Sequence, residues 1–187
     1  MAECLTGARY LAKSLHDYGV TDVFFMEAIL RHTLLELEKL GVRRVLAHSE
    51  KGAAYMADGY ARASGKVGIC MAQSVGATNL AAGLQDAYLA RSPVIAFTGH
   101  KAIPELQRNA YQEIAHPALY QSVTRFSASI EDASQLPILL RQAFREATAP
   151  TPRPAHLDFV GNTGEVMELG PVDEPVAVDV GRRLLSA

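Results

Sequence analysis

The sequence predicts an α/β fold with an open, mostly parallel sheet of about six strands and helices on both faces of the sheet. Segments with the 3.6-residue period of a helix alternate along the chain with short apolar runs, as this fold class requires. Two of the runs, residues 67–72 and 93–98, are apolar almost throughout, which is typical of strands buried on both sides in a parallel sheet. The 187 residues suffice for one such domain with a substantial core.

The first half of the chain repeats a helix, a glycine and a strand three times. Apolar residues at helical spacing predict helices over residues 5–18, 29–40 and 50–63, and the glycines at positions 19, 41 and 65 end them. The runs that follow predict strands over residues 23–26, 43–47 and 67–72. The third helix carries small residues that permit close packing, namely Ala53, Ala54, Ala57 and Ala61.

The second half continues the alternation less regularly. Residues 77–89, rich in alanine and leucine, predict a helix, and residues 93–98 predict a buried strand. Residues 99–121, with two prolines, predict a long irregular segment, and segments of that length are often functional. A strand over 122–130, a helix over 131–147 with Pro137 near its first turns, and a strand over 154–160 complete the domain.

The pattern dissolves from Gly161 onward. Glycines and prolines punctuate this part, and residues 171–180 read as an extended linker. We therefore expect one domain over residues 1–165 and a linker-like tail over residues 166–187 that leads toward a domain missing from this chain.

Composition excludes several classes of function. The net charge is −2 and there is no cluster of lysine and arginine, so we expect neither a nucleic acid nor a membrane surface as partner. The N-terminal residues lack the apolar core of a secretory signal, and no stretch approaches the ~20 apolar residues that span a bilayer. The two cysteines, Cys4 and Cys70, fit a reducing, cytoplasmic location.

Polar residues follow three of the predicted strands. In a parallel sheet the carboxyl ends of the strands share one edge, where ligands bind, so residues 48–50, 73–76 and 98–100 should cluster. Glu50 opens a predicted helix there, and Ser49 fits its N-cap. Taken alone, a carboxylate in a first helical turn only complements the helix dipole.

Residues 48–62, His-Ser-Glu-Lys-Gly-Ala-Ala-Tyr-Met-Ala-Asp-Gly-Tyr-Ala-Arg, change that interpretation. They resemble the catalytic-glutamate segment of thiamine-diphosphate enzymes of the acetolactate synthase type. The resemblance continues through residues 79–88 and 92–99, weakens at 111–113, and closes at 154–158. It covers most of residues 5–160 and identifies the chain as similar to the N-terminal pyrimidine-binding domain of that family.

The resemblance implies a role for each matching residue. Glu50 is the expected catalytic residue: a carboxyl group bonded to the far nitrogen of the cofactor's pyrimidine ring favours the imino form of its amine, which takes the proton from the thiazolium carbon. Cofactor binding is expected of Glu50, Ser74, Gly76, Asn79 and Gln112. The segment 74–76 is one residue shorter than the family's Ser-Gly-Pro-Gly, and structurally it could be only a tight turn with Gly76 at a steric pinch.

The resemblance also implies a substrate channel, lined by Met26, Glu27, Ala28 and Tyr111. Relatives carry Gly-x-Pro-Gly after the first strand, whereas this chain has Phe25-Met26-Glu27-Ala28. The alternative interpretation makes Phe25 and Met26 core residues and Glu27 a helix cap. Gln112 sits in the irregular segment and could equally be a solvated loop residue.

No metal ligand is expected in this chain. The Gly-Asp-Gly segment that anchors Mg²⁺ in the family is absent, so the ligands of Mg²⁺ are expected in another domain or chain. No cysteine and histidine cluster has zinc spacing. His100 and His116 are interpreted as surface or hydrogen-bonded residues, and His116 before Pro117 could be the first residue of a helix.

The function implied is the pyrimidine-binding half of a thiamine-diphosphate-dependent carboligase or decarboxylase acting on a 2-oxo acid such as pyruvate. Its partners would be a diphosphate-binding domain or subunit and further copies of this domain, in a dimer or tetramer. Two alternatives stay open: a free subunit of a two-chain 2-oxo acid decarboxylase, and a non-catalytic α/β assembly module.

Overall fold

The computed structural model describes residues 5–27 and 30–161. In these ranges six strands form one sheet: β1 (Asp22–Phe25), β2 (Arg43–Leu46), β3 (Gly68–Gln73), β4 (Val94–His100), β5 (Phe126–Ile130) and β6 (Ala155–Val160). The α-helices are α1 (Gly7–Asp17), α2 (Arg31–Lys39), α3 (Glu50–Ser64), α4 (Gly76–Leu89), α5 (His116–Tyr120) and α6 (Leu136–Thr148). Two 3₁₀ turns, η1 (Ile103–Glu105) and η2 (Ala133–Gln135), complete the list.

Every strand pair in the sheet is parallel, and the strand order is β2-β1-β3-β4-β6-β5. The predicted α/β class with a parallel sheet is confirmed. The order reverses between β1 and β3, and in sheets of this kind the ligand binds at the carboxyl ends of the strands beside such a reversal. The segments after β1, β2 and β3 therefore lie where a ligand is expected.

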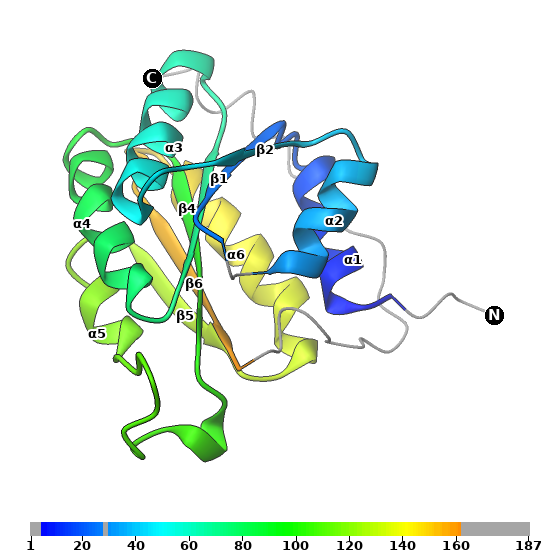
Figure 1. Ribbon diagram of the computed structural model, residues 1–187. Helices are drawn as coiled ribbons and strands as arrows, with labels where there is room; N and C mark the ends of the chain where they lie inside the picture. The colour runs from blue at the N-terminus through cyan, green and yellow to red at the C-terminus, as the bar shows by residue number, and fades with distance from the viewer. Residues whose placement is uncertain (1–4, 28–29, 162–187) are drawn as a thin grey trace.

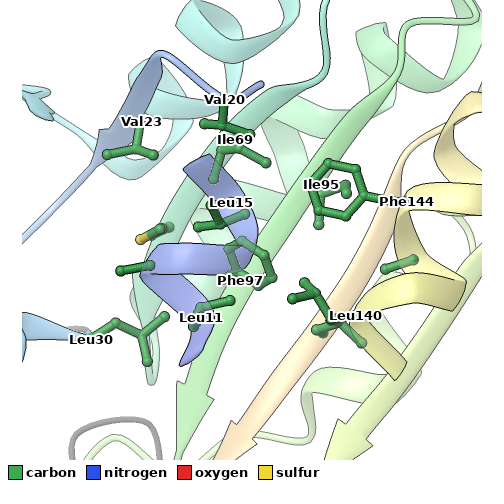
Figure 2. Packing of buried hydrophobic residues seen from close by; sticks show 14 of the residues in the cluster. Leu11, Leu15, Val20, Val23, Leu30, Ile69, Ile95, Phe97, Leu140 and Phe144 are labelled. Carbon is green, nitrogen blue, oxygen red and sulfur yellow. The ribbon is translucent and has the colours of Figure 1, made fainter. Parts of the chain in front are cut away.

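Helices cover both faces of the sheet, with α1, α2 and α6 on one face and α3, α4 and α5 on the other (Figure 1). Each face buries its own apolar cluster. On the first face, leucines of α1 and α6 pack against Ile95 and Phe97 of β4 (Figure 2). Burial of such side chains is the main stabilising contribution to this fold, at about 25 cal/mol per Å² of apolar surface.

The second face is packed through small residues. Ala53, Ala54 and Ala57 of α3 are fully buried. A Cβ at Gly83 of α4 would stand 2.7 Å from the Cβ of Ala54, and one at Gly68 of β3 would clash with the carbonyl group of Ala57. The small residues therefore let α3 lie directly against β3 and α4, as the sequence predicts. This close packing sets the positions of the first turns of α3 and α4.

Several boundaries differ from those expected. The strand expected from residue 122 begins at Phe126, because the segment before it turns back, with the amide of Val123 donating to the carbonyl of Tyr120. The helix expected from residue 131 begins as η2, where Asp132 and Gln135 form a capping box, and continues as α6 with Pro137 in its first turn. The irregular segment expected over residues 99–121 is shorter, since β4 extends to His100 and α5 begins at His116.

The first turn after β1 also departs from expectation. The helix expected from residue 29 is α2, which begins at Arg31 after Leu30 in a left-handed conformation, and no side chain caps it. The interpretation of Glu27 as its cap is therefore wrong. Ala28 and the expected tail over residues 166–187 lie outside the described residues. Within the described ranges, no helix has the length and apolarity needed to cross a membrane.

Candidate functional site

Glu50 stands at the mouth of α3, directly after β2. The side chain of Ser49 accepts a hydrogen bond from the Gly52 amide at 3.1 Å, so Ser49 is the N-cap that the sequence predicts. This cap fixes the first turn of the helix and, with it, the direction in which the Glu50 side chain leaves the backbone. The Glu50 side chain is half-buried and lies over the start of the neighbouring helix α4.

Gly76, the first residue of α4, faces Glu50. A Cβ at position 76 would stand 2.6 Å from Glu50 Oε1 and 3.1 Å from Glu50 Cδ. Real Cβ atoms do not approach that closely, so the carboxyl group occupies the space that a side chain would fill. Gly76 keeps a backbone conformation that other residues adopt, so it is needed for space and not for an unusual turn.

Asn79 completes this group one turn into α4. Its amide Nδ2 donates to Glu50 Oε2 at 3.2 Å. The structure thus brings together three of the residues expected at the cofactor, Glu50, Gly76 and Asn79, from two helix N-termini that are far apart in sequence. One carboxylate oxygen of Glu50 is held by an amide, and the other faces a position without a side chain.

Ser74 lies in the turn that leads from β3 into α4. It adopts a left-handed conformation, with φ of 53°, and is buried. Its carbonyl oxygen accepts a hydrogen bond from His116 Nε2 at 2.9 Å. A left-handed non-glycine residue costs about 1 kcal/mol or more. The contact with His116 therefore helps to hold the turn that places Gly76.

The other expected site residues do not join this group. Gln112 and Tyr111 lie on the segment between η1 and α5, where Gln112 Nε2 donates to Tyr111 Oη at 3.1 Å and the Tyr111 side chain is 79% exposed. Glu27 is exposed, and Met26 packs partly buried against the apolar cluster of the α3 face. Within the part of the chain that the structure describes, none of these four forms a hydrogen bond or ion pair with Glu50.

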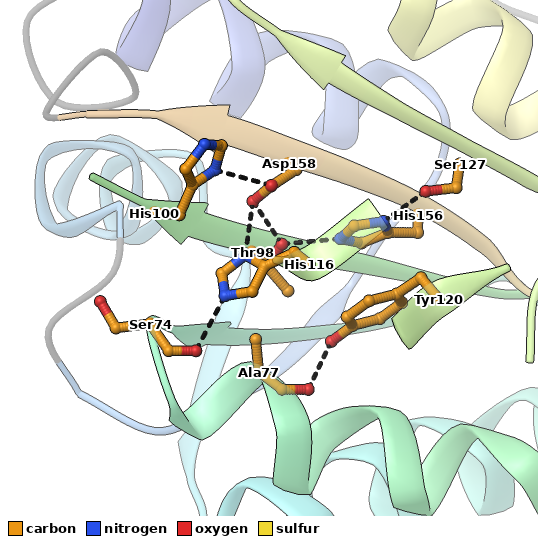
Figure 3. Close-up of polar contacts among 9 residues, drawn as sticks. All are labelled: Ser74, Ala77, Thr98, His100, His116, Tyr120, Ser127, His156 and Asp158. Atoms are coloured by element: carbon orange, nitrogen blue, oxygen red, sulfur yellow. Dashed lines mark hydrogen bonds and ion pairs between the residues drawn. The ribbon is translucent and has the colours of Figure 1, made fainter. Parts of the chain in front are cut away.

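A buried polar network lies beside the Ser74 turn, on the face of the sheet that α4 and α5 cover (Figure 3). Its centre is Asp158 of β6, which is fully buried. Asp158 Oδ1 accepts hydrogen bonds from Thr98 Oγ1 at 2.7 Å and from His116 Nδ1 at 3.0 Å. Asp158 Oδ2 lies 2.7 Å from His100 Nδ1, an ion-pair distance without the alignment of a hydrogen bond.

The network shifts the pKa values of its members in opposite directions. Burial opposes ionisation of Asp158, but the contacts with His100 and His116 outweigh it and hold the pKa of the carboxyl group below its usual value. The contact with Asp158 raises the pKa of His100. Asp158 is therefore an ionised carboxylate in the interior, and such a charge requires a cation nearby.

His156 is the neutral member of the network. Its Nε2 lies 2.6 Å from Thr98 Oγ1 and its Nδ1 lies 2.8 Å from Ser127 Oγ, and its ring stacks on Tyr120 with 3.6 Å between ring centroids. Complete burial lowers the pKa of His156 to about 3. The hydroxyl group of Tyr120 donates to the Ala77 carbonyl in the first turn of α4.

Sequence reasoning missed His156 and Asp158 as site residues, because they lie in a run that reads as a buried strand, whereas Thr98 belongs to a segment expected at the ligand-binding edge. A signal was present: His156 and Asp158 are two residues apart in an otherwise apolar strand, so both point to one face. His100 and His116 were expected to be surface or hydrogen-bonded residues. The second description holds for His116, which is buried and is also the first residue of α5.

Comparisons with known proteins agree with this geometry. The family described as "Thiamine pyrophosphate enzyme, N-terminal TPP binding domain" matches residues 5–119, more than half of the chain. An acetolactate synthase of Arthrospira platensis is 35% identical over 186 residues, covering 96% of this chain and 32% of the relative. The large subunit of acetolactate synthase isozyme 2 of Escherichia coli is 36% identical over 157 residues, covering 83% and 29%.

A solved structure from Mycobacterium smegmatis, assigned as a thiamin diphosphate-dependent enzyme, superposes with a TM-score of 0.81 at 23% identity. It covers 96% of this chain and 36% of the other, and at that identity it supports the fold. The chain spans about one third of the length of the curated relatives it matches.

Fold and site together define a doubly wound α/β cofactor-binding domain with a carboxylate at a helix mouth. The chain belongs to the family of N-terminal cofactor-binding domains of thiamine pyrophosphate (thiamine diphosphate) enzymes.

Proposed function

We propose that this domain binds the aminopyrimidine half of thiamine diphosphate in an enzyme that acts on a 2-oxo acid such as pyruvate, as acetolactate synthases do. One observation carries the proposal: the Glu50 carboxyl group lies against the empty Cβ position of Gly76, while Asn79 holds its other oxygen. A pure scaffold has no need for a carboxylate placed in this way.

The residues present fit the cofactor. Because Gly76 has no side chain, the Glu50 carboxyl group can lie directly against the first turn of α4, where the cofactor ring would meet it. The donor set is a carboxyl group, an amide and the backbone of a turn, and it suits the ring nitrogen and exocyclic amine of an aminopyrimidine. When bound, thiamine diphosphate supplies an acidic carbon that adds, once deprotonated, to the carbonyl carbon of the substrate.

Each residue has a definite part in this proposal. Asn79 occupies Glu50 Oε2, so Oε1 is the oxygen left to share a proton with the pyrimidine ring. The shared proton biases the ring toward the tautomer whose amine can accept a proton. The Ser74 turn lines the pocket, and its contact with His116 keeps it in place.

The remaining site residues are proposed to act in the assembled enzyme. Gln112 and Tyr111 lie on an exposed segment, from which they would reach a cofactor held by a neighbouring subunit. Met26, Glu27 and Ala28 would border the substrate channel at the end of β1. Their difference from the family's glycine and proline turn would reshape the part of the channel that receives the side chain of the 2-oxo acid.

The proposed function also assigns a role to each part of the chain. Residues 1–165 would form the pyrimidine-binding domain, and residues 166–187 would lead toward the part of the enzyme that binds the diphosphate group through Mg²⁺. Because the chain spans about one third of its relatives, that part would be another domain or chain. The cofactor would then bind between this domain and a partner in a dimer or tetramer, in the cytoplasm.

A direct assay tests the function. The intact protein, with any partner chain that co-purifies, is incubated with thiamine diphosphate, Mg²⁺ and a panel of 2-oxo acids that includes pyruvate, and CO₂ release is followed. We expect cofactor-dependent release with at least one 2-oxo acid. Stoichiometric cofactor binding without turnover of any 2-oxo acid would contradict the proposed substrate class, and absence of cofactor binding would contradict the proposal as a whole.

A further inference from the structure

His100, His116 and Asp158 converge from the end of β4, the start of α5 and the middle of β6. One ligand-type atom of each lies within 4.8 Å of the others. We propose that these three side chains bind a divalent first-row transition-metal ion, with Zn²⁺ the best match, at a site separate from the Mg²⁺ of the cofactor. This proposal does not depend on the function proposed above.

The donor set selects the metal. Two imidazole nitrogens with one carboxylate oxygen suit Zn²⁺ and its first-row neighbours, whereas Mg²⁺ and Ca²⁺ prefer oxygen ligands alone. A tetrahedral Zn²⁺ with bonds of about 2.0–2.2 Å separates its ligand atoms by roughly 3.3 Å. His116 Nδ1 lies 3.0 Å from Asp158 Oδ1, His100 Nδ1 lies 2.7 Å from Asp158 Oδ2, and one ligand atom of each residue lies within 4.8 Å of the others, so the side chains would adjust their positions to hold the ion.

Neighbouring groups orient two of the three ligands as they do in known metal sites. His116 donates from Nε2 to the Ser74 carbonyl at 2.9 Å, which leaves Nδ1 directed at Asp158. Metal-binding histidines commonly donate their second ring nitrogen to a backbone carbonyl in this way. Thr98 donates to Asp158 Oδ1 at 2.7 Å and so fixes the plane of the carboxylate.

Among the described residues, two buried atoms at the centre meet as an ion pair and find no aligned hydrogen-bond partner. Asp158 Oδ2 and His100 Nδ1 lie 2.7 Å apart and are both shielded from solvent, yet they do not align as a hydrogen bond. A cation bound between them would coordinate both atoms and would neutralise a carboxylate that is fully buried. His100 is the most accessible ligand, with 13% of its side chain exposed, which offers an entry path and an open coordination position.

The same geometry defines the competing arrangement. Both ring nitrogens of His116 face oxygen atoms that accept hydrogen bonds. Without a metal, His116 satisfies both only by carrying two protons, as an imidazolium cation that balances Asp158. A metal ion takes the place of the proton on Nδ1. Metal binding should therefore release a proton, whereas a plain imidazolium–carboxylate pair binds no metal.

Metal titration separates the two arrangements. The intact protein is stripped with a chelator and titrated with CoCl₂ by visible spectroscopy and with ZnCl₂ by calorimetry. We expect one equivalent per chain, visible absorption bands typical of low-symmetry Co²⁺, and no competition from MgCl₂. His100→Ala should weaken Zn²⁺ binding by at least about 100-fold, and Thr98→Val by about 10- to 100-fold.

A histidine variant outside the cluster serves as the control. His32→Ala removes an exposed histidine outside the cluster and should leave Zn²⁺ affinity unchanged. Zn²⁺ should raise the Tm of the parent protein and of His32→Ala but not that of His100→Ala, and the metal-free Tm of each variant reports whether it folds. Absence of stoichiometric binding to the stripped parent protein, or equal binding by His100→Ala, would overturn the proposal and leave the imidazolium pair as the account of the cluster.

Discussion

The carboxyl group of Glu50 fills the space that a side chain at position 76 would occupy, with only 2.6 Å between Glu50 Oε1 and a Cβ added to Gly76. The two residues come from different helices, each of which begins at the carboxyl end of a strand. The position of the carboxyl group therefore depends on how α3 packs against α4, and small residues at that interface set the distance.

Replacing Gly76 by alanine should displace the Glu50 carboxyl group and leave the fold intact. The side-chain atoms of Glu50 are the ones that the new methyl group meets, and a flexible side chain moves more readily than a backbone. Alanine also favours a helix over glycine by up to about 1 kcal/mol. We expect unchanged or slightly higher stability and at least about 10-fold weaker thiamine diphosphate binding or turnover.

Gly59→Ala is the matched control for this substitution. Gly59 also lies in a helix, and a Cβ there meets nothing within 4 Å. It should match Gly76→Ala in stability by thermal unfolding while retaining parent cofactor affinity. Parent-like cofactor binding and turnover in Gly76→Ala would show that the close approach to Glu50 has no functional role.

Removing the amide of Asn79 should loosen the Glu50 carboxyl group without breaking the site. The hydrogen bond from Nδ2 to Glu50 Oε2 is 3.2 Å long and Asn79 is exposed, so we expect the contribution of an ordinary hydrogen bond, about 0.5–1.5 kcal/mol. Asn79→Ala should lower kcat by about 3- to 10-fold, measured with saturating cofactor. Gln85→Ala, an exposed polar residue of the same helix, should leave kcat unchanged, and an equal loss in both variants would argue against this role of Asn79.

Tyr120 ties α5 to the first turn of α4. Its hydroxyl group donates to the Ala77 carbonyl at 2.9 Å in a fully buried position. Tyr120→Phe leaves that carbonyl without its side-chain donor, so we expect a loss of about 1–3 kcal/mol in the free energy of unfolding, measured by urea denaturation. Tyr111→Phe, on an exposed side chain, should change it by less than about 0.5 kcal/mol. Similar effects of the two substitutions would contradict the importance of the buried hydrogen bond.

His156 should make the protein less stable as the pH falls below neutral. Its pKa is about 3 in the folded state, against about 6.5 in the unfolded chain, so between these values only the unfolded state takes up the proton. The free energy of unfolding therefore falls as the pH drops from about 6.5 toward 3, by up to about 1.4 kcal/mol per pH unit from this group. Because the pKa of Asp158 is lowered in the folded state, this group reduces the free energy of unfolding only when the pH falls below about 3.9, the pKa of aspartate in the unfolded chain.

His156→Gln removes this titration and keeps an amide that can replace the contacts with Thr98 and Ser127. Between pH 6 and pH 4.5 the variant should lose less stability than the parent protein. His100 has a raised pKa, so its contribution is complete below pH 6.5 and stays constant in this window. Because His116 and Asp158 face the same network and are unchanged in the variant, the difference in slope isolates His156. Equal slopes would contradict the buried neutral state.

The sequence predicts the fold well because most helices and strands have a recognisable pattern within their own residues. The glycines at positions 19, 41 and 65, the apolar runs at β3 and β4 and the alternation of periods give both the strand number and the parallel class. The order of the strands is harder to predict from the sequence. The position of β6 between β4 and β5 depends on which strand pairing buries most surface, and no local sequence pattern indicates that pairing.

The candidate site likewise has one part that local sequence patterns predict and one part that depends on long-range contacts. Glu50, Gly76 and Asn79 lie at element boundaries, where the resemblance and the fold class point to the same edge of the sheet, and the structure brings them together. The cluster around Asp158 depends on the pairing of β4 with β6 and on a loop that returns His116 to the sheet. Such long-range contacts leave only a weak trace in a single sequence, here the spacing of His156 and Asp158.

The Glu50 carboxyl group is proposed to activate the cofactor. The most direct measurement is the rate at which the acidic carbon proton of bound thiamine diphosphate exchanges with D₂O, followed by rapid quench and NMR in the intact protein. Glu50→Gln keeps the shape of the side chain and removes its proton-sharing group, so exchange should slow by about 100-fold or more while the Tm stays close to that of the parent protein. Exchange at the parent rate in a folded Glu50→Gln protein that still binds the cofactor would contradict the account.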